Sequence, residues 1–223
     1  MHGIFDQFVP TVIAGGLTNS VIMPFVVAGL VTLLSLVRFG HKPGRMQIIL
    51  ELVYNQIAEL LGPHARQYTP LMMTLFLYIT IANLLGAVPG VFPITSHVSV
   101  TFGLALVVFF TCLFAGLVLN TKNFVAHFVL DGVPKALVPF LATMEVFLYL
   151  LKPLTLAVRL GVNITVGHIV MSVLAGVGAS FAGGTVGILP VMVFVNLLEL
   201  MFCVIQAAIF TILGCTYLEE ACH

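Results

Sequence analysis

Long apolar runs, separated by short polar stretches, dominate this chain. One membrane crossing by a helix takes about 20 mostly apolar residues, and five segments of the sequence approach or exceed that length. They cover about residues 21–37, 71–88, 98–119, 137–181 and 186–218. The pattern therefore predicts an all-α membrane protein with about five transmembrane helices.

Residues 46–61, between the first two apolar runs, follow a different pattern. A polar side chain recurs at every fourth position and most of the others are apolar; the polar residues are Gln47, Glu51, Asn55 and Glu59. This period gives a helix one polar face and leaves it too polar to cross a membrane. We expect an amphipathic helix that lies on the membrane surface or against another subunit.

The last two apolar runs are longer than a single crossing requires. The final run has about 33 residues, which extend over about 50 Å as a helix, whereas the hydrocarbon core of a bilayer is about 30 Å thick. A typical tilt of about 20° does not absorb the difference. We expect two long C-terminal helices, steeply inclined or broken, that form a hairpin around the turn at Gly183-Gly184.

The composition supports a membrane protein and excludes other classes. Of the 223 residues, 61% are hydrophobic and only 7% are charged, whereas about 25% are charged in a typical soluble domain; the mean hydropathy is +1.20. This excludes a soluble enzyme, a nucleic-acid-binding protein and a disordered linker. We expect a single membrane domain over residues 1–223, with a first helix and loop, a surface helix, a transmembrane hairpin and a long inclined hairpin at 1–45, 46–66, 68–120 and 136–218.

Basic residues predict the orientation, because they concentrate in loops on the inner side of a membrane. Two segments, at about 38–66 and 120–135, hold Arg38, Lys42, Arg45, Arg66, Lys122 and Lys135. The loops that alternate with them, at 89–97 and 182–187, hold no Lys or Arg. Five crossings then place the N-terminus on the outer side and the C-terminus on the inner side.

The cysteines are the obvious candidates for a metal or redox site. They are Cys112, Cys203, Cys215 and Cys222. They show no CxxC spacing, and three of them lie in apolar runs. We therefore expect small apolar packing residues, and we expect neither a metal nor a cofactor.

Polar residues form a stripe on each of the last two predicted helices. Such residues are costly inside a membrane and mark functional sites. At spacings of three, four or seven residues, one helical face of the first carries Glu145, Lys152, Thr155, Arg159 and Asn163. At steps of three, four and three residues, one face of the second carries Asn196, Glu199, Cys203 and Gln206. Two facing stripes suggest a hydrated path or a protein interface.

The ionisable residues differ in what they can do. The guanidinium of Arg159 stays charged, which suits it to attract carboxylates and repel cations. His168 lies about 13 Å further along the helix and roughly on its opposite face, and both His168 and Glu199 can take up and release a proton. Structural roles remain open: an ion pair for Arg159 and Glu199, packing for His168, and interhelical hydrogen bonds for the amides Asn163, Asn196 and Gln206.

Residues 152–168, KPLTLAVRLGVNITVGH, resemble the signature of subunit a of the rotary F-type ATP synthases, approximately P-x-S-L-A-x-R-L-F-G-N-x-x-A-G-H/E. Residues 196–200 and 206–213 resemble the closing segment of that family, and residues 83–90 and 93–101 also look like family segments. The chain departs from the pattern at Thr155, where the family has Ser, and around Gly161. Asn163 keeps its spacing of four residues from Arg159.

The resemblance implies a stator subunit that holds two offset half-channels against a rotating ring of c subunits. Arg159 matches the essential barrier between them. A proton from the outer side would neutralise a ring carboxylate, and after nearly a full turn the carboxylate would release it into the inner half-channel. Glu145 matches an acid of the inner half-channel, and the other residues assigned to the proton path are His168, Glu199, Asn163, Gln206, Asn196, Asn83 and His97.

The resemblance also implies partners and a location. The partners are the c-subunit ring, the peripheral stalk and other Fo subunits, the lipid bilayer and, indirectly, the F1 sector; nucleic acid is not among them. The chain has no nucleotide-binding motif, so we expect no enzyme activity of the chain by itself. The expected location is the mitochondrial inner membrane, with the bacterial plasma membrane as the alternative.

Two other functions fit the polar stripes. A stand-alone proton-coupled transporter predicts activity of the isolated chain. A non-catalytic membrane scaffold predicts that neutral residues of similar size can replace Arg159 and Glu199.

Overall fold

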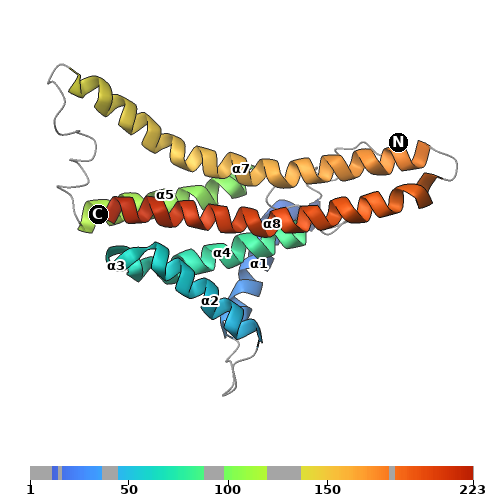
Figure 1. The fold of residues 1–223 in the computed structure, drawn as a ribbon, viewed down its shortest axis with the longest axis horizontal. Coiled ribbons are helices and arrows are strands. Elements are labelled where there is room, and N and C mark those ends of the chain that lie inside the picture. The colour runs from blue at the N-terminus through green and yellow to red at the C-terminus, as the bar shows by residue number, and fades with distance from the viewer. Residues whose placement is uncertain are drawn as a thin grey trace. The chain divides into compact units, whose positions relative to one another are not determined.

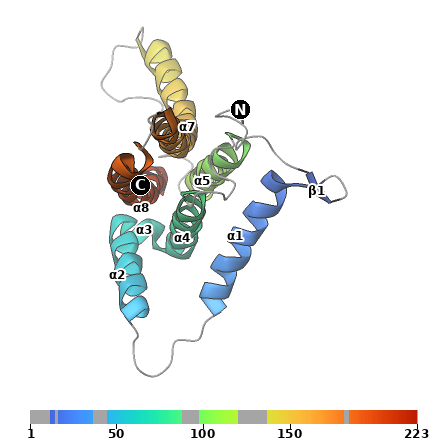
Figure 2. The same ribbon diagram turned by 90° about the vertical axis from the view of Figure 1, so that its right-hand side faces the viewer.

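The computed structural model describes residues 12–14, 17–36, 45–87, 98–119, 137–180 and 184–222. In these ranges the chain is helical except for two short strands (Figure 1). Strand β1 (Val12–Ala14) pairs in antiparallel direction with β2 (Leu17–Thr18), just before the first helix (Figure 2). The prediction of an all-α membrane fold is confirmed, with this small hairpin as an addition.

The helices follow the apolar runs of the sequence. They are α1 (Asn19–Leu36), α4 (Thr69–Gly86), α5 (Val98–Leu119), α7 (Val138–Ser180) and α8 (Gly184–Cys222). Within the described residues, the segments that contain α4, α5, α7 and α8 are long and apolar enough to span a membrane. Helix α1 coincides with the first predicted crossing, and its described apolar stretch, Met23–Leu33, is shorter.

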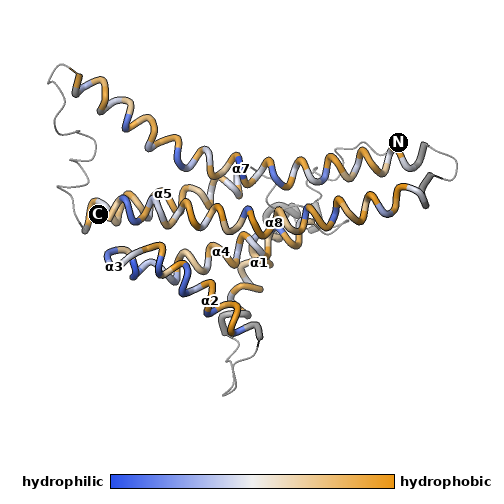
Figure 3. Tube along the Cα trace, viewed as in Figure 1, coloured by the Kyte–Doolittle hydropathy of each residue, from blue (hydrophilic) through white to orange (hydrophobic). Residues whose placement is uncertain are grey.

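Helix α2 (Arg45–Leu60) is the predicted amphipathic helix. Glu51, Asn55 and Glu59 are exposed, whereas Ile57 is buried. Helix α3 (Gly62–Ala65) and the 3-10 turn η2 (Arg66–Tyr68) follow and lead into α4. Figure 3 shows hydrophilic stretches on both α2 and α3. The position of α2 on a membrane surface stays a prediction.

The two long helices are continuous in the described residues. Helix α7 has 43 residues and α8 has 39, so each extends over about 60 Å and exceeds the hydrocarbon thickness of about 30 Å. Neither Pro153 in α7 nor Pro190 in α8 ends its helix. The two helices are therefore not broken into shorter segments, and each is longer than the hydrocarbon core is thick. Near their connection the helices are in contact, because a Cβ built on Gly178 would lie 3.7 Å from Ile188 Cδ1.

The chain divides into two compact units. The first comprises residues 1–38, 76–101 and 159–209. In it, α1 packs on α4 around Val27, Val31 and Ala82, and the Tyr78 hydroxyl donates to the Pro24 carbonyl at 3.4 Å. A second cluster joins α4, α7 and α8 through side chains of Ala87, Ile164 and Cys203.

The second unit comprises residues 39–75, 102–158 and 210–223. Here Gly214 of α8 allows close packing, since a Cβ there would lie 3.4 Å from Val108 Cγ1 and 3.5 Å from Met72 Sδ. The Phe109 ring of α5 contacts the Tyr149 ring of α7 at a centroid distance of 5.3 Å. Both long helices pass through both units, so this division does not decide whether the chain is a single membrane domain. The single domain stays a prediction.

Candidate functional site

The first unit contains a cavity of about 480 Å³ between α7 and α8. Most of its walls are apolar, and two side chains that line it can form strong hydrogen bonds, Asn163 and Glu199. The lining residues come from one face of each helix: Val162, Asn163, Val166, Gly167 and Val170 on α7, and Val195, Leu198, Glu199 and Phe202 on α8. The cavity therefore brings together one member of each polar stripe.

Glu199 is the buried acid of this cavity, with only 8% of its surface exposed. Its Oε1 atom has no hydrogen-bond partner among the described residues. An unsatisfied buried polar atom is rare in proteins and calls for an explanation such as a water or a catalytic role. The carboxyl group is thus placed to bind a proton, a water molecule or a group of another chain.

Gly167 provides the space that the Glu199 carboxyl group occupies. A Cβ built on Gly167 would overlap Glu199 Oε1 and lie 2.7 Å from Cδ. Any larger residue at position 167 therefore displaces the carboxyl group. Gly167 belongs to the family signature, but its role beside Glu199 does not follow from the sequence, because the contact joins residues that are distant in the chain.

His168 faces α4 and is 92% buried, with 8% of its surface exposed. Its Nε2 atom lies 2.7 Å from the carbonyl oxygen of Gly86, in the last turn of α4, and donates to it in the matching tautomer. Its position agrees with the spacing argument, which placed it away from the Arg159 face. His168 also lies close enough to Glu199 for an electrostatic interaction.

Asn83 and Cys203 connect α4 to α8 one turn from Glu199. Asn83 Nδ2 donates to the Cys203 carbonyl oxygen at 3.4 Å, and Cys203 Sγ donates to the Asn83 carbonyl oxygen at 3.5 Å. Both residues are fully buried, and Asn83 Oδ1 has no hydrogen-bond partner among the described residues. This pair fixes the end of α4 beside the acid.

The α8 stripe predicted from the sequence is mostly buried. Gln206 is 7% exposed, and its Nε2 atom has no hydrogen-bond partner in the described part of the chain. Asn196 is half-buried. With Glu199 and Cys203, these residues line one side of α8 with hydrogen-bonding groups, of which Glu199 Oε1 and Gln206 Nε2 have no partner among the described residues. All four cysteines are buried and free, in agreement with the packing role expected for them.

Arg159 is exposed. Among the described residues it has no ion pair, so the alternative of a structural pair between Arg159 and Glu199 finds no support. Arg159 precedes Asn163 by one helical turn, which places both on neighbouring parts of the same α7 face. The charge therefore lies next to the cavity along α7 and faces outward from the chain.

Among the described candidates, Glu145 does not line this cavity. Glu145 is half-buried on α7, within the second unit. Lys152, of the same stripe, forms an ion pair with Glu220, which the sequence analysis did not consider. The only signal for Glu220 was an acidic pair in the last turn of α8. His97 lies outside the described residues. The part of the chain that the structure describes contains no cluster of three metal-binding side chains.

Known proteins resemble this chain over most of its length. The model of the family described as ATP synthase A chain matches residues 18–219. ATP synthase subunit a of Parvibaculum lavamentivorans is 38% identical over 213 residues, which cover 91% of this chain and 82% of that protein. ATP synthase subunit a of Chelativorans sp. is 40% identical, and the match covers 82% of this chain and 78% of that protein. ATP synthase subunit a of Bradyrhizobium diazoefficiens is 36% identical, and the match covers 92% of this chain and 88% of that protein.

Proposed function

Because this chain belongs to the ATP synthase A chain family, we propose that it is the proton-translocating stator subunit of an Fo sector. In this role it provides two half-channels, through which a rotating ring of c subunits takes up and releases protons. The chain is not an enzyme by itself, and ATP is made or hydrolysed on partner subunits. The observation that carries the proposal is the buried, unsatisfied carboxyl oxygen of Glu199 in a cavity beside Arg159.

The outer half-channel is assigned to the polar side chains around the cavity. A proton passes His168 and Glu199 and neutralises a ring carboxylate, which can then enter the lipid because a neutral carboxyl group is far less costly there than a charged one. The unsatisfied amide atoms of Asn83 and Gln206 support this assignment, since they offer hydrogen-bonding positions to water. The amides that belong to this path are Asn83, Asn163, Asn196 and Gln206; His97 is assigned to it from the sequence alone.

Arg159 separates the two half-channels in this mechanism. Its fixed positive charge repels protons and other cations, and it attracts a ring carboxylate that has lost its proton. The inner half-channel, to which Glu145 belongs, receives that proton. Each proton that crosses releases about 2.3 kcal/mol per 100 mV, so a direct leak past Arg159 would dissipate the energy that drives rotation.

The surface around Arg159 suits contact with an apolar ring. Exposed valines recur along α7 at spacings of three or four residues: Val158, Val162, Val166, Val170, Val173 and Val177. At about 100° per residue they cover an arc of about 120°, and Arg159 falls inside it. Over residues 158–177 this apolar face, which includes the cavity-lining Val162, Val166 and Val170, carries Arg159 as its one cation. Such a face fits a partner that presents apolar helices and a carboxylate.

The proposed partners are the c-ring, the peripheral stalk and other Fo subunits, the lipid bilayer and, indirectly, the F1 sector. The relatives described above are bacterial, which favours a bacterial plasma membrane over the mitochondrial inner membrane. The distribution of basic residues places the N-terminus outside and the C-terminus inside. Proton rather than sodium coupling is proposed, because His168 and Glu199 both carry protons.

Passive proton flux through membranes from which F1 has been removed tests the proposed function. Membranes with the complete Fo sector should conduct protons at least about tenfold faster than membranes that lack this chain, a difference of about 1.4 kcal/mol in the barrier. Flux should be measured as the decay of a potassium-imposed voltage. Equal flux in both membranes contradicts the proposal, and equal flux through the isolated chain in vesicles favours a stand-alone transporter.

A second prediction concerns the space at Gly167. Gly167→Val should lower ATP-driven acidification of membrane vesicles by about tenfold, because the new side chain displaces the Glu199 carboxyl group and fills part of the cavity. The rate should be divided by the amount of assembled complex. Gly176→Val is the matched control on the same helix, since a Cβ there meets nothing within 4 Å. Similar losses in both variants would show that valine lowers the acidification rate by disturbing the helix, and not by displacing Glu199.

A further inference from the structure

The second unit contains a charged contact between α7 and α8 that the proposed function does not use. Lys152 Nζ donates to Glu220 Oε2 at 2.7 Å. Lys152 lies in the first half of α7, and Glu220 lies in the last turn of α8, 68 residues later. The two side chains are 19% and 38% exposed. A partly sheltered pair of this kind is screened less than a fully exposed one.

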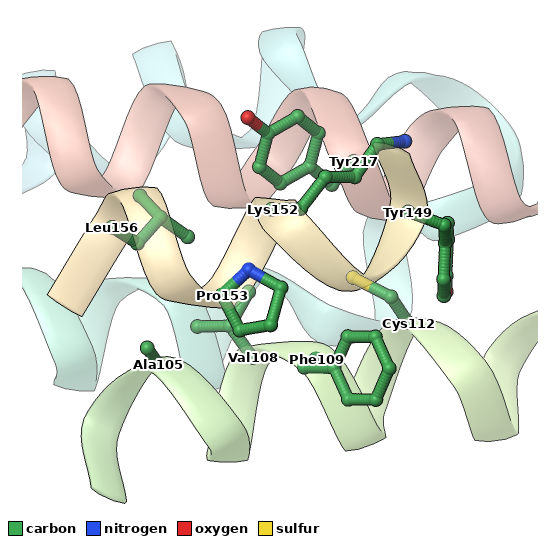
Figure 4. A pocket seen from close by; sticks show the side chains of 9 residues that line it. All are labelled: Ala105, Val108, Phe109, Cys112, Tyr149, Lys152, Pro153, Leu156 and Tyr217. Atoms are coloured by element: carbon green, nitrogen blue, oxygen red, sulfur yellow. The ribbon is translucent and has the colours of Figure 1, made fainter. Parts of the chain in front are cut away.

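Two tyrosine rings enclose the same ammonium group. Lys152 Nζ lies 5.0 Å from the centroid of the Tyr149 ring and 4.8 Å from that of Tyr217. Figure 4 shows the end of the Lys152 side chain extending toward these rings, with Phe109 of α5 on the opposite wall of the small cavity. A cation within about 6 Å of a ring centroid is attracted by the π-electrons. Lys152 therefore contacts Tyr149 of its own helix, α7, and Tyr217 and Glu220 of α8.

The contact with Lys152 also has an electrostatic consequence for the last turn of α8. Glu219 and Glu220 lie at the negative end of the helix dipole, where acids are unfavourable, and the described last turn holds no basic residue. Lys152 supplies a compensating charge to Glu220. Glu219 points to a different element, because a Cβ built on Gly62 would lie 3.1 Å from Glu219 Oε1. Gly62 has a φ of +60°, which favours glycine at that corner.

We propose that Lys152 is a positioning residue that fixes the register of α7 against α8. The inference rests on the proposed function, in which α7 carries Arg159 and α8 carries Glu199. Since both helices are continuous, sliding of one along the other at this end changes the spacing of the groups that handle protons. The contacts of Lys152 with Glu220 and Tyr217 of α8 oppose that sliding while the ring exerts force on the helices, and Tyr149 holds the ammonium group from its own helix.

A double-mutant cycle on proton coupling tests the inference. The complex is studied in inverted membrane vesicles, and the initial rate of acidification is divided by the rate of ATP hydrolysis. Lys152→Met and Glu220→Gln should each lower this ratio by about threefold or more, and the double variant should lose no more than either single variant. Lys152→Arg should keep most of the ratio, because a guanidinium also pairs with a carboxylate and stacks on aromatic rings.

Glu219→Gln is the matched control for the cycle. It removes the neighbouring acid, which does not contact Lys152, so its effect should multiply with that of Lys152→Met. A wild-type ratio in Lys152→Met, or effects of Lys152→Met and Glu220→Gln that multiply, overturns the inference. If Lys152→Met lowers the amount of assembled complex, the double-mutant cycle is carried out on the amount of complex in place of the ratio. A wild-type amount in Lys152→Met, or effects of the two single variants that multiply, again overturns the inference. A wild-type complex that does not acidify the vesicles contradicts the proposed function itself.

Discussion

Arg159→Gln should abolish ATP-driven acidification of membrane vesicles while leaving the complex assembled. The substitution keeps a polar side chain of moderate length and removes the positive charge. Without it, a ring carboxylate that has lost its proton has no fixed counter-charge beside the stator, and holding a charged group there costs several kcal/mol. We expect a loss of more than about a hundredfold, equivalent to about 2.7 kcal/mol. The fluorescence quench of a pH-sensitive dye measures it.

Passive proton leak in the same vesicles separates the barrier role from a structural one. If Arg159 blocks the direct route between the half-channels, F1-depleted vesicles with Arg159→Gln should conduct protons at least as fast as wild type, although they do not pump. Arg66→Gln, which removes a cation from the η2 turn, is the control and should pump normally. Wild-type pumping by Arg159→Gln contradicts the assigned role and favours the scaffold function.

The periodicity of the sequence predicted most of the helices, because the pattern directly reflects the solvent around each residue. In a membrane, apolar side chains face lipid as well as the interior, so apolar runs mark the helices but not the contacts between them. The run at 137–181 corresponds closely to α7 (Val138–Ser180). Pro153 did not end this helix, since a proline inside a long membrane helix is tolerated when neighbouring helices support it.

The candidate site was predictable only in part. Spacing placed Asn163 near Arg159 on α7 and located Glu199 on a polar face of α8, because a single helix fixes such relations. Contacts between helices follow from packing, which the pattern does not encode. Two features of the site depend on such contacts between helices. They are the carbonyl group of Gly86, which accepts from His168, and the space at Gly167.

The stripe of Glu145, Lys152 and Arg159 shows the same limit. The spacing put all three on one face and suggested a hydrated path or a protein interface. In the structure, Lys152 contacts Glu220 and two tyrosines, whereas Arg159 is exposed without an ion pair among the described residues. One helical face can thus serve different contacts at different depths, because neighbouring elements differ from turn to turn.

Glu199→Gln should lower both ATP-driven acidification and passive proton flux by more than about tenfold, or about 1.4 kcal/mol. Glutamine has nearly the same shape, so the space beside Gly167 stays filled as before. It cannot release or take up a proton near neutral pH, which interrupts transfer between the outer side and the ring. Arg159→Gln, in contrast, should stop pumping without slowing passive flux, so measuring both quantities assigns the two residues to different steps.

Glu219→Gln provides the matched control, because it makes the same chemical change on the same helix outside the cavity. Its passive flux should stay close to that of wild type. Glu199→Asp keeps an acid but withdraws it by one methylene group from the position opposite Gly167, and its flux should fall between those of wild type and Glu199→Gln. If Glu199→Gln conducts protons as wild type does, the unsatisfied oxygen of Glu199 has another explanation, and the proton path must run through His168 and the amides without this acid.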